Sequence, residues 1–183
     1  MIRWFTEHGV VDTSMRTLAT GIGTSNRMLN YHFGSREDLL TAVIEQVCAS
    51  EELAIRDYLA ESPDPFVAGA AYWQHAAATA DTFAPLFYEL AAHAMYGKLY
   101  AQRLQQILTE SWLAAFTEGF ARVTDGQQAL RLAHLSLAVG RGVLFELALT
   151  GDRATADATI AAFTAMTREA IDLPTTVGGD LPR

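Results

Sequence analysis

A stretch of twenty residues near the N-terminus, from Ser14 to Phe33, constrains the fold of this chain more than any other segment. Its first half has apolar residues at i, i+3 and i+4, the spacing of one face of a short helix. Gly21 and Gly23 then end that helix and permit positive φ in a turn. In the second half Leu29 and Phe33 lie four residues apart, so a second short helix has one packing side. The stretch predicts a helix-turn-helix, which places its second helix in the major groove of DNA.

The other side of this second helix carries side chains that suit base edges and phosphates. Arg27 can donate two hydrogen bonds to guanine, and Asn26 or Asn30 can bridge the N6 and N7 atoms of adenine. Met28 can touch a thymine methyl group, while nearby hydroxyl, phenol and imidazole groups can bond phosphate oxygens. The residues predicted to contact DNA are Thr13, Ser14, Thr24, Ser25, Asn26, Arg27, Met28, Asn30, Tyr31, His32 and Arg36.

Hydroxyl side chains are expected to cap the helices of this region. Thr13 is a candidate N-cap for the first helix of the motif and Thr24 for the second. Ser35, with Asp38 three residues on, forms a capping box that starts a longer helix. Arg36 falls in the first turn of that helix, where its charge opposes the helix dipole. A phosphate contact and an ordinary solvated arginine explain it equally well.

The order of these residues resembles the N-terminal domain of the tetracycline-repressor (TetR) family over roughly residues 3 to 47. The matching residues are Glu7-His8-Gly9, Thr13-Ser14-Met15-Arg16, Leu18-Ala19, Gly23-Thr24-Ser25, Leu29, Tyr31-His32-Phe33-Gly34-Ser35-Arg36-Glu37 and Leu39-Leu40. Asn30 stands where the family usually has tyrosine and Arg27 where it has a small residue, which leaves the operator sequence open. The resemblance implies that residues 26–28 and 30–32 face DNA.

Two features lower the DNA affinity expected of this chain. The family's first helix usually begins further upstream, whereas only Ile2 to His8 are available here, so either the start lies further upstream or a short helix supports the motif. The formal net charge is −8, and phosphate neutralisation dominates DNA affinity. The first 36 residues nevertheless hold four arginines against two acidic residues. We therefore expect binding that weakens strongly with added salt.

Composition and helix breakers predict the organisation of the rest. Half of the residues are hydrophobic and no period-two alternation occurs, so we predict an all-α protein of about nine helices. Breaks are expected at Ser62-Pro63-Asp64-Pro65, Ala84-Pro85, Gly97, Thr124-Asp125-Gly126 and Thr150-Gly151-Asp152, with Pro85 in the first turn of a helix. The predicted domains are a helix-turn-helix DNA-binding domain over 1–47, a helical effector-binding and dimerisation domain over 48–173, and a disordered tail over 174–183.

Cysteine content and hydropathy favour a soluble cytoplasmic protein. Cys48 is the only cysteine, which excludes a disulfide within the chain, and a buried inert thiol is a simpler interpretation than a redox switch. No signal peptide opens the sequence. The longest apolar run, Leu132–Leu149, is interrupted by His134, Arg141 and Glu146.

The last two predicted helices, within Asp125–Leu149 and Asp157–Ile171, are apolar on more than one face. One face serves the core, and the second either meets another protomer or is buried within a monomer. Small residues such as Ala138 and Gly140 allow helices to approach closely. The resemblance implies a homodimer through these two helices, and two-fold symmetry suits a palindromic DNA operator.

Residues 66 to 122 combine many aromatic side chains with a few polar ones, as small-molecule sites do. Aromatic residues at helical spacing more often form a core, but the resemblance implies an effector site here. The predicted ligand-binding residues are Trp73, Phe87, His93, Tyr96, Trp112, Phe116, His134 and Arg141. His134 and Arg141 either face an acidic ligand or pair with Glu146 at the dimer contact.

No catalytic signature is present, so we expect no enzyme, no cofactor and no metal. Ser136 lies outside any nucleophile elbow, and Gly140-Arg141-Gly142 lacks the strand and third glycine of a phosphate loop. Glu89 and His93 could share a metal but have no obvious third ligand. The leading hypothesis is a repressor released from its operator by a small-molecule effector. The alternative is a helical small-molecule-binding protein with impaired or lost DNA binding, which the acidic balance and the short first helix favour.

Overall fold

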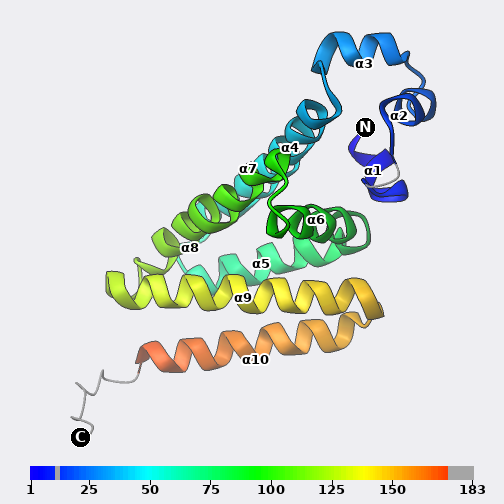
Figure 1. Cartoon of the computed structure of the whole chain (residues 1–183). Helices are drawn as coiled ribbons and strands as arrows, with labels where there is room; N and C mark the ends of the chain where they lie inside the picture. The colour runs from blue at the N-terminus through cyan, green and yellow to red at the C-terminus, as the bar shows by residue number, and fades with distance from the viewer. Residues whose placement is uncertain (11–12, 173–183) are drawn as a thin grey trace, which may run out of the picture.

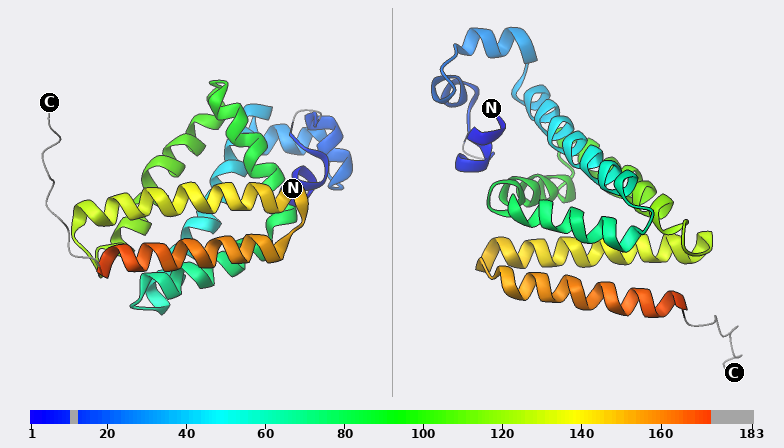
Figure 2. Two further views of the ribbon diagram at one scale, coloured as in Figure 1. Left: turned by 90° about the horizontal axis from the view of Figure 1, so that it is seen from below. Right: turned by 180° about the vertical axis from the view of Figure 1, so that it is seen from behind.

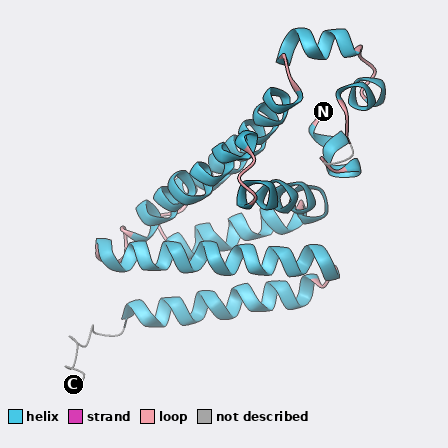
Figure 3. Ribbon diagram, in the orientation of Figure 1, coloured by secondary structure: helices cyan, strands magenta, loops and turns pink. Residues whose placement is uncertain are grey.

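The computed structural model describes residues 1–10 and 13–172, and every regular element in this part of the chain is helical (Figure 3). The elements are α1 (Ile2–His8), α2 (Met15–Gly21), α3 (Asn26–Phe33), α4 (Arg36–Glu61), α5 (Pro65–Ala78), α6 (Ala80–Met95), the 3-10 turn Leu99–Ala101, α7 (Gln102–Gln106), the π-helical segment Ile107–Ser111, α8 (Trp112–Phe120), α9 (Gly126–Thr150) and α10 (Arg153–Asp172). Because α7, the π-helical segment and α8 are continuous, the described residues form nine helical rods. The predicted class and helix number are confirmed. The predicted disordered tail lies outside the described residues.

The helices form a small group at one end of a larger body (Figures 1 and 2). The group contains α1, α2 and α3, and α4 runs from it along α7 and α8 into the body. On the far side from α3, α9 and α10 lie antiparallel, with α5 and α6 packed between them and the small group. By length and composition alone, α9 is the one described helix that could cross a membrane. It packs here against α8, α6 and α10.

Serine side chains cap the N-termini of α2, α3 and α4. The capping box is confirmed, because Ser35 Oγ accepts a hydrogen bond from the backbone N–H of Asp38 and the Asp38 carboxylate accepts one from the N–H of Ser35. For α2 and α3 the N-caps are Ser14 and Ser25, each accepting a bond of 3.1 Å, rather than the predicted Thr13 and Thr24. Adjacent threonine and serine are both good caps, so the pattern misplaced each helix start by one residue.

Two breaker residues have roles that differ from the predicted ones. Gly23 turns the chain with φ +71°, but Gly21 is the last residue of α2 and leaves room for a close approach. A Cβ on Gly21 would lie 1.8 Å from a ring carbon of Trp4 in α1. Pro85 lies inside α6 instead of in its first turn, because α5 and α6 are separated at Thr79. Because Pro85 lies beyond the first turn of α6, its missing N–H leaves the Asp81 carbonyl without its usual helical donor.

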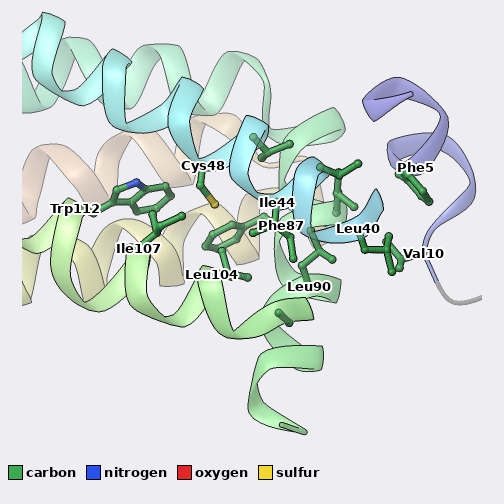
Figure 4. Packing of buried hydrophobic residues seen from close by; sticks show 14 of the residues in the cluster. Phe5, Val10, Leu40, Ile44, Cys48, Phe87, Leu90, Leu104, Ile107 and Trp112 are labelled. Carbon is green, nitrogen blue, oxygen red and sulfur yellow. The ribbon is translucent and has the colours of Figure 1, made fainter. Parts of the chain in front are cut away.

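One hydrophobic core runs from the small group into the body (Figure 4). Figure 4 follows this row of buried side chains, which contains Phe5, Val10, Leu40, Ile44, Cys48, Phe87, Leu90, Leu104, Ile107 and Trp112. Phe5 and Val10 belong to α1 and the residues after it, whereas Trp112 belongs to α8. Since protein interiors are close-packed and transmit strain, a displacement near Trp112 is felt along this row.

Candidate nucleic-acid interface and ligand cavity

Helix α3 is anchored on one side and open on the other. Leu29 is only 5% exposed and Phe33 packs partly buried against the core, whereas Met28 is 45% and Tyr31 81% exposed. Arg27 is exposed as well. The predicted division of this helix into a packing side and a free side is therefore confirmed. Side chains on the free side can reach the edges of bases in a groove.

Nine of the eleven residues predicted to contact DNA are exposed together on the N-terminus of α2, the turn and α3, at the top of Figure 1. They are Ser14, Thr24, Ser25, Asn26, Arg27, Met28, Asn30, Tyr31 and His32. In addition to those predicted, Arg16, Thr17 and Thr20 on α2 are exposed. The helix N-termini of α2 and α3 supply backbone N–H groups beside these side chains, as phosphate contacts require.

The other two predicted residues, Thr13 and Arg36, form hydrogen bonds with backbone groups that lie between α1 and α2. Thr13 is 4% exposed, and its hydroxyl donates to the Gly9 carbonyl at 2.9 Å. The Arg36 guanidinium donates from Nε to the Thr13 carbonyl at 3.0 Å and from Nη2 to the Val10 carbonyl at 2.5 Å. Arg36 is thus not an ordinary solvated arginine, because two of its nitrogens are bonded to backbone carbonyls, and its contact with a phosphate stays a prediction. Its hydrogen bonds attach the start of α4 to the residues that precede α2.

Glu89 on α6, in the body, bonds to a residue of the same segment between α1 and α2. Both of its carboxylate oxygens accept the Val10 N–H, each at 2.9 Å. His93, which the sequence paired with Glu89 as a possible metal site, instead bonds the Tyr100 hydroxyl at 2.8 Å. No group of three metal-ligating side chains occurs within residues 1–10 and 13–172. The Val10 contact spans 79 positions in sequence, and no local signal could have predicted it.

A cavity of about 120 Å³ lies inside the body, between α9 and the helices packed around it. Its walls come from α4, α5, α6, α8, α9 and α10, and most of the lining is aromatic or aliphatic. The lining residues are Ile55, Pro65, Phe66, Gly69, Tyr72, Trp73, Ala76, Phe83, Phe87, Trp112, Phe116, Phe120, Ser136, Leu137, Gly140, Arg141, Leu144, Ile160, Phe163 and Thr167. An engineered protein cavity of roughly 150 Å³ binds benzene, so this space holds about one ring.

Five of the eight predicted ligand-binding residues line this cavity, namely Trp73, Phe87, Trp112, Phe116 and Arg141. The other three, His93, Tyr96 and His134, lie outside it. Tyr96 follows the end of α6 and is 83% exposed, and His134 is exposed on α9. Sequence composition could not identify the walls from α4 and α10, because it does not tell which distant helix covers an aromatic segment.

The polar groups of the cavity wall are mostly paired with protein partners. Trp73 Nε1 donates to Asp157 at 2.6 Å, and this bond is the main cause that lowers the pKa of the Asp157 carboxyl. The Tyr72 hydroxyl donates to Glu51 at 3.1 Å, and burial raises the pKa of Tyr72 well above its usual value. Two buried donors have no partner, Arg141 Nε and Trp112 Nε1.

The outer faces of α9 and α10 carry large apolar side chains in solvent. Leu130, Leu135, Phe145, Leu149 and Met166 are all more than 40% exposed. Small residues, among them Ala138 and Gly142, lie exposed on the same outer stripe of α9. Large apolar side chains exposed in number on neighbouring helices are a feature of interaction surfaces more often than of a monomer's solvated face.

Comparisons with known proteins agree with this architecture. Residues 2–43 match the family model described as bacterial regulatory proteins of the tetR family. A TetR transcriptional regulator from Legionella pneumophila is similar in structure, with 18% identity, a TM-score of 0.73 and 92% and 91% of the two chains covered. No curated protein matches the chain by sequence.

Two named repressors share the fold. SmeT, the repressor of the Stenotrophomonas maltophilia multidrug efflux pump SmeDEF, is 19% identical with a TM-score of 0.66, and the match covers 97% of this chain and 92% of SmeT. AlkX from Dietzia, a TetR family repressor implicated in biodegradation of n-alkanes, is 17% identical with a TM-score of 0.58 and 94% of each chain covered. At these identities the likeness establishes the fold and leaves ligands and operators to be argued from the chain itself.

Proposed function

The chain belongs to the TetR family of bacterial regulatory proteins, and from this membership we propose that it is a transcriptional repressor released from its operator by a small molecule. The family fold supports DNA-binding transcriptional regulation. The observation that carries the proposal for this chain is the open face of α3, where Arg27 and Tyr31 lie in solvent while Leu29 is buried behind them. In this proposal residues 1–47 bind DNA, and residues 48–173 bind the effector and the partner subunit in the cytoplasm.

Base reading is assigned to α3 and backbone binding to its surroundings. Arg27 donates to guanine, Asn26 or Asn30 to adenine, and Met28 contacts a thymine methyl group. Tyr31, His32 and the hydroxyls of Ser14 and Thr24 bond phosphate oxygens. The net positive charge of the first 36 residues is small, so the affinity depends on these directed contacts and falls steeply with salt.

The apolar outer stripe of α9 and α10 is assigned to a second copy of the chain. A palindromic operator needs two α3 helices related by a two-fold axis, and a self-complementary helical face provides that symmetry. Two helices from each subunit would bury Leu135, Phe145 and Met166, which a monomer leaves in solvent. The same contact accounts for an apolar α9 without a membrane.

Release is assigned to two connections between the cavity and α1–α3. Phe83 and Phe87 on α6 line the cavity, and Glu89 on the same helix accepts the Val10 N–H beside α2. The buried row from Trp112 to Leu40 provides the second connection through α4 (Figure 4). A ligand that binds better to a shifted arrangement of these helices draws the two α3 helices out of register with DNA.

A gel-shift titration with the DNA flanking the protein's own gene tests the proposal. Arg27→Ala is expected to weaken binding by about tenfold to a hundredfold, the cost of losing a bidentate base contact. Arg56→Ala removes the same charge from an exposed position in the second half of α4 and should leave the affinity unchanged. Wild-type affinity in the Arg27 variant would refute base reading by this residue. Absence of salt-sensitive DNA binding by the wild-type chain would favour a ligand-binding protein without an operator.

A further inference from the structure

The two residues whose buried donors lack partners are in contact in the wall of the cavity, where the Arg141 guanidinium lies over the Trp112 ring. The centre of the Arg141 guanidinium is 5.8 Å from the centre of the Trp112 ring, and both residues line the cavity. Arg141 Nε and Trp112 Nε1 are each buried from solvent without a hydrogen-bond acceptor. A buried donor left unsatisfied carries its full desolvation cost, and the cost is larger for a charged group. A bound acceptor would remove that cost.

The charge of Arg141 also lacks a carboxylate partner. No acidic side chain of the described residues lies within ion-pairing distance of its guanidinium, which donates only from Nη2, to the Leu108 carbonyl at 3.0 Å. The acids closest to the cavity wall serve other groups. Glu51 accepts from Tyr72, and Asp157 accepts from Trp73 and Arg153. Among the described residues, the cavity wall therefore holds one positive charge that contacts the face of the Trp112 ring but has no carboxylate partner.

The guanidinium is fixed before any ligand arrives. Its Nη2 bond attaches it to the π-helical segment at Leu108, and the Tyr88 hydroxyl donates to the backbone carbonyl of Arg141 at 2.5 Å. Helical segments of π type occur often at functional sites. A donor that is already oriented loses little entropy when it meets an acceptor. This favours Arg141 as the group that orients the ligand.

From these observations we propose that the cavity binds an aromatic monocarboxylate, with its carboxylate on Arg141 Nε and Trp112 Nε1 and its ring among the aromatic side chains. This inference rests on the proposed function, because it names the ligand class of the same cavity. A planar carboxylate presents two acceptor oxygens, and guanidinium recognises that geometry. The volume of about 120 Å³ admits one ring, with Phe87 and Trp112 stacked in parallel at 5.9 Å on its wall. A phosphate, with more charge and more acceptors, would meet only one arginine.

Isothermal titration with four acids tests the class on the wild-type protein. The probes are benzoate, phenylacetate, 3-phenylpropionate and 2-naphthoate, each compared with its primary amide of equal shape. At least one acid should bind at least tenfold more tightly than its amide, because a charge-assisted bond is stronger than a neutral one. Equal affinities for acids and amides would overturn the anionic class but would leave a cavity ligand in place. No binding by any of the eight compounds would count against both this inference and the effector part of the proposed function.

Three variants then locate the contact. Arg141→Met retains the length of the side chain and should weaken acid binding by about tenfold to a hundredfold without affecting amide binding. Trp112→Phe removes the indole donor together with part of the ring system, and it should weaken acid binding by about threefold to tenfold more than amide binding. Arg56→Met, on the exposed surface of α4, is the matched control and should change nothing. Circular dichroism and thermal unfolding verify the fold of each. A folded Arg141→Met that binds the acid as wild type does would overturn the assignment.

Discussion

The open face of α3 consists of residues close together in sequence, whereas the cavity in the body is lined by residues from distant helices. The α3 face is made by consecutive residues, with Leu29 as its main buried anchor, so its other side chains can change without disturbing a core. The cavity is made by six helices whose lining side chains also pack against one another. Substitutions on the exposed side of α3 should therefore leave stability unchanged, whereas substitutions in the cavity wall also change the packing of the body.

The two regions are nevertheless parts of one packed unit. Leu40, Ile44 and Cys48 on α4 lie between α1 and Trp112 in the same buried cluster (Figure 4). Glu89 adds a polar connection from α6 to Val10. Each of the following substitutions should either affect one region and not the other, or measure how strongly the folding of the two regions is coupled.

A charge introduced on the outer stripe of α9 should affect dimerisation and DNA binding and leave the cavity intact. Leu135→Asp places a charge on the proposed subunit contact, and light scattering should show a dimer of 19.9 kDa chains become a monomer. DNA binding should be lost with the second α3. Val67→Asp, equally exposed on α5, is expected to leave the dimer unchanged. A Leu135→Asp variant that remains dimeric would place the subunit contact elsewhere.

The shared core should unfold as one unit. Leu40→Ala removes a fully buried side chain and should cost about 2–5 kcal/mol of unfolding free energy in urea. Leu53→Ala, on the exposed side of the same helix, should cost less than about 0.5 kcal/mol. We expect a single transition for both variants. Two separated transitions would mean that α1–α3 and the body are energetically independent.

The thiol of Cys48 reports how well the core between the two regions is sealed. Burial, with a smaller contribution from the Glu51 charge, raises the pKa of Cys48 from 9.0 to about 12. At pH 8 the reactive thiolate is then about a thousandfold scarcer than in an ordinary cysteine. Ellman's reagent should react with the native protein far more slowly than with a Ser50→Cys variant, whose new thiol is exposed. Fast reaction of native Cys48 would reveal frequent opening along α4.

Substitution of Gly21 should affect the DNA-binding region alone. Alanine there would place Cβ 1.8 Å from the Trp4 ring, and such overpacking costs about 1–3 kcal/mol. DNA affinity should fall, while binding in the cavity, which meets α4 only at Ile55 in its second half, should not change. Adding Trp4→Leu should restore part of the loss, because the two changes act on one contact. Equal effects of the single and double variants would show that α1 does not support α2 through this contact.

Local patterns predicted the helix-turn-helix and distant packing decided the rest. The apolar spacing around Leu29 and the Ser35 capping box are properties of neighbouring residues, so the sequence alone was sufficient for them. The sequence placed Arg141 and His134 together, either at an acidic ligand or paired with Glu146, whereas the structure separates them, with Arg141 in the cavity wall and His134 exposed. The bonds of Arg36 and Glu89 to the Val10 region join segments far apart in sequence, and no periodicity encodes such contacts.

A hydroxyl-radical footprint of the wild-type protein on the DNA flanking its gene tests the central claim most directly. Two α3 faces on a two-fold axis predict two protected patches related by a palindrome, with centres about 10–10.5 base pairs apart or a multiple of that spacing. A single protected patch, or uniform weak protection at every position, would contradict the account.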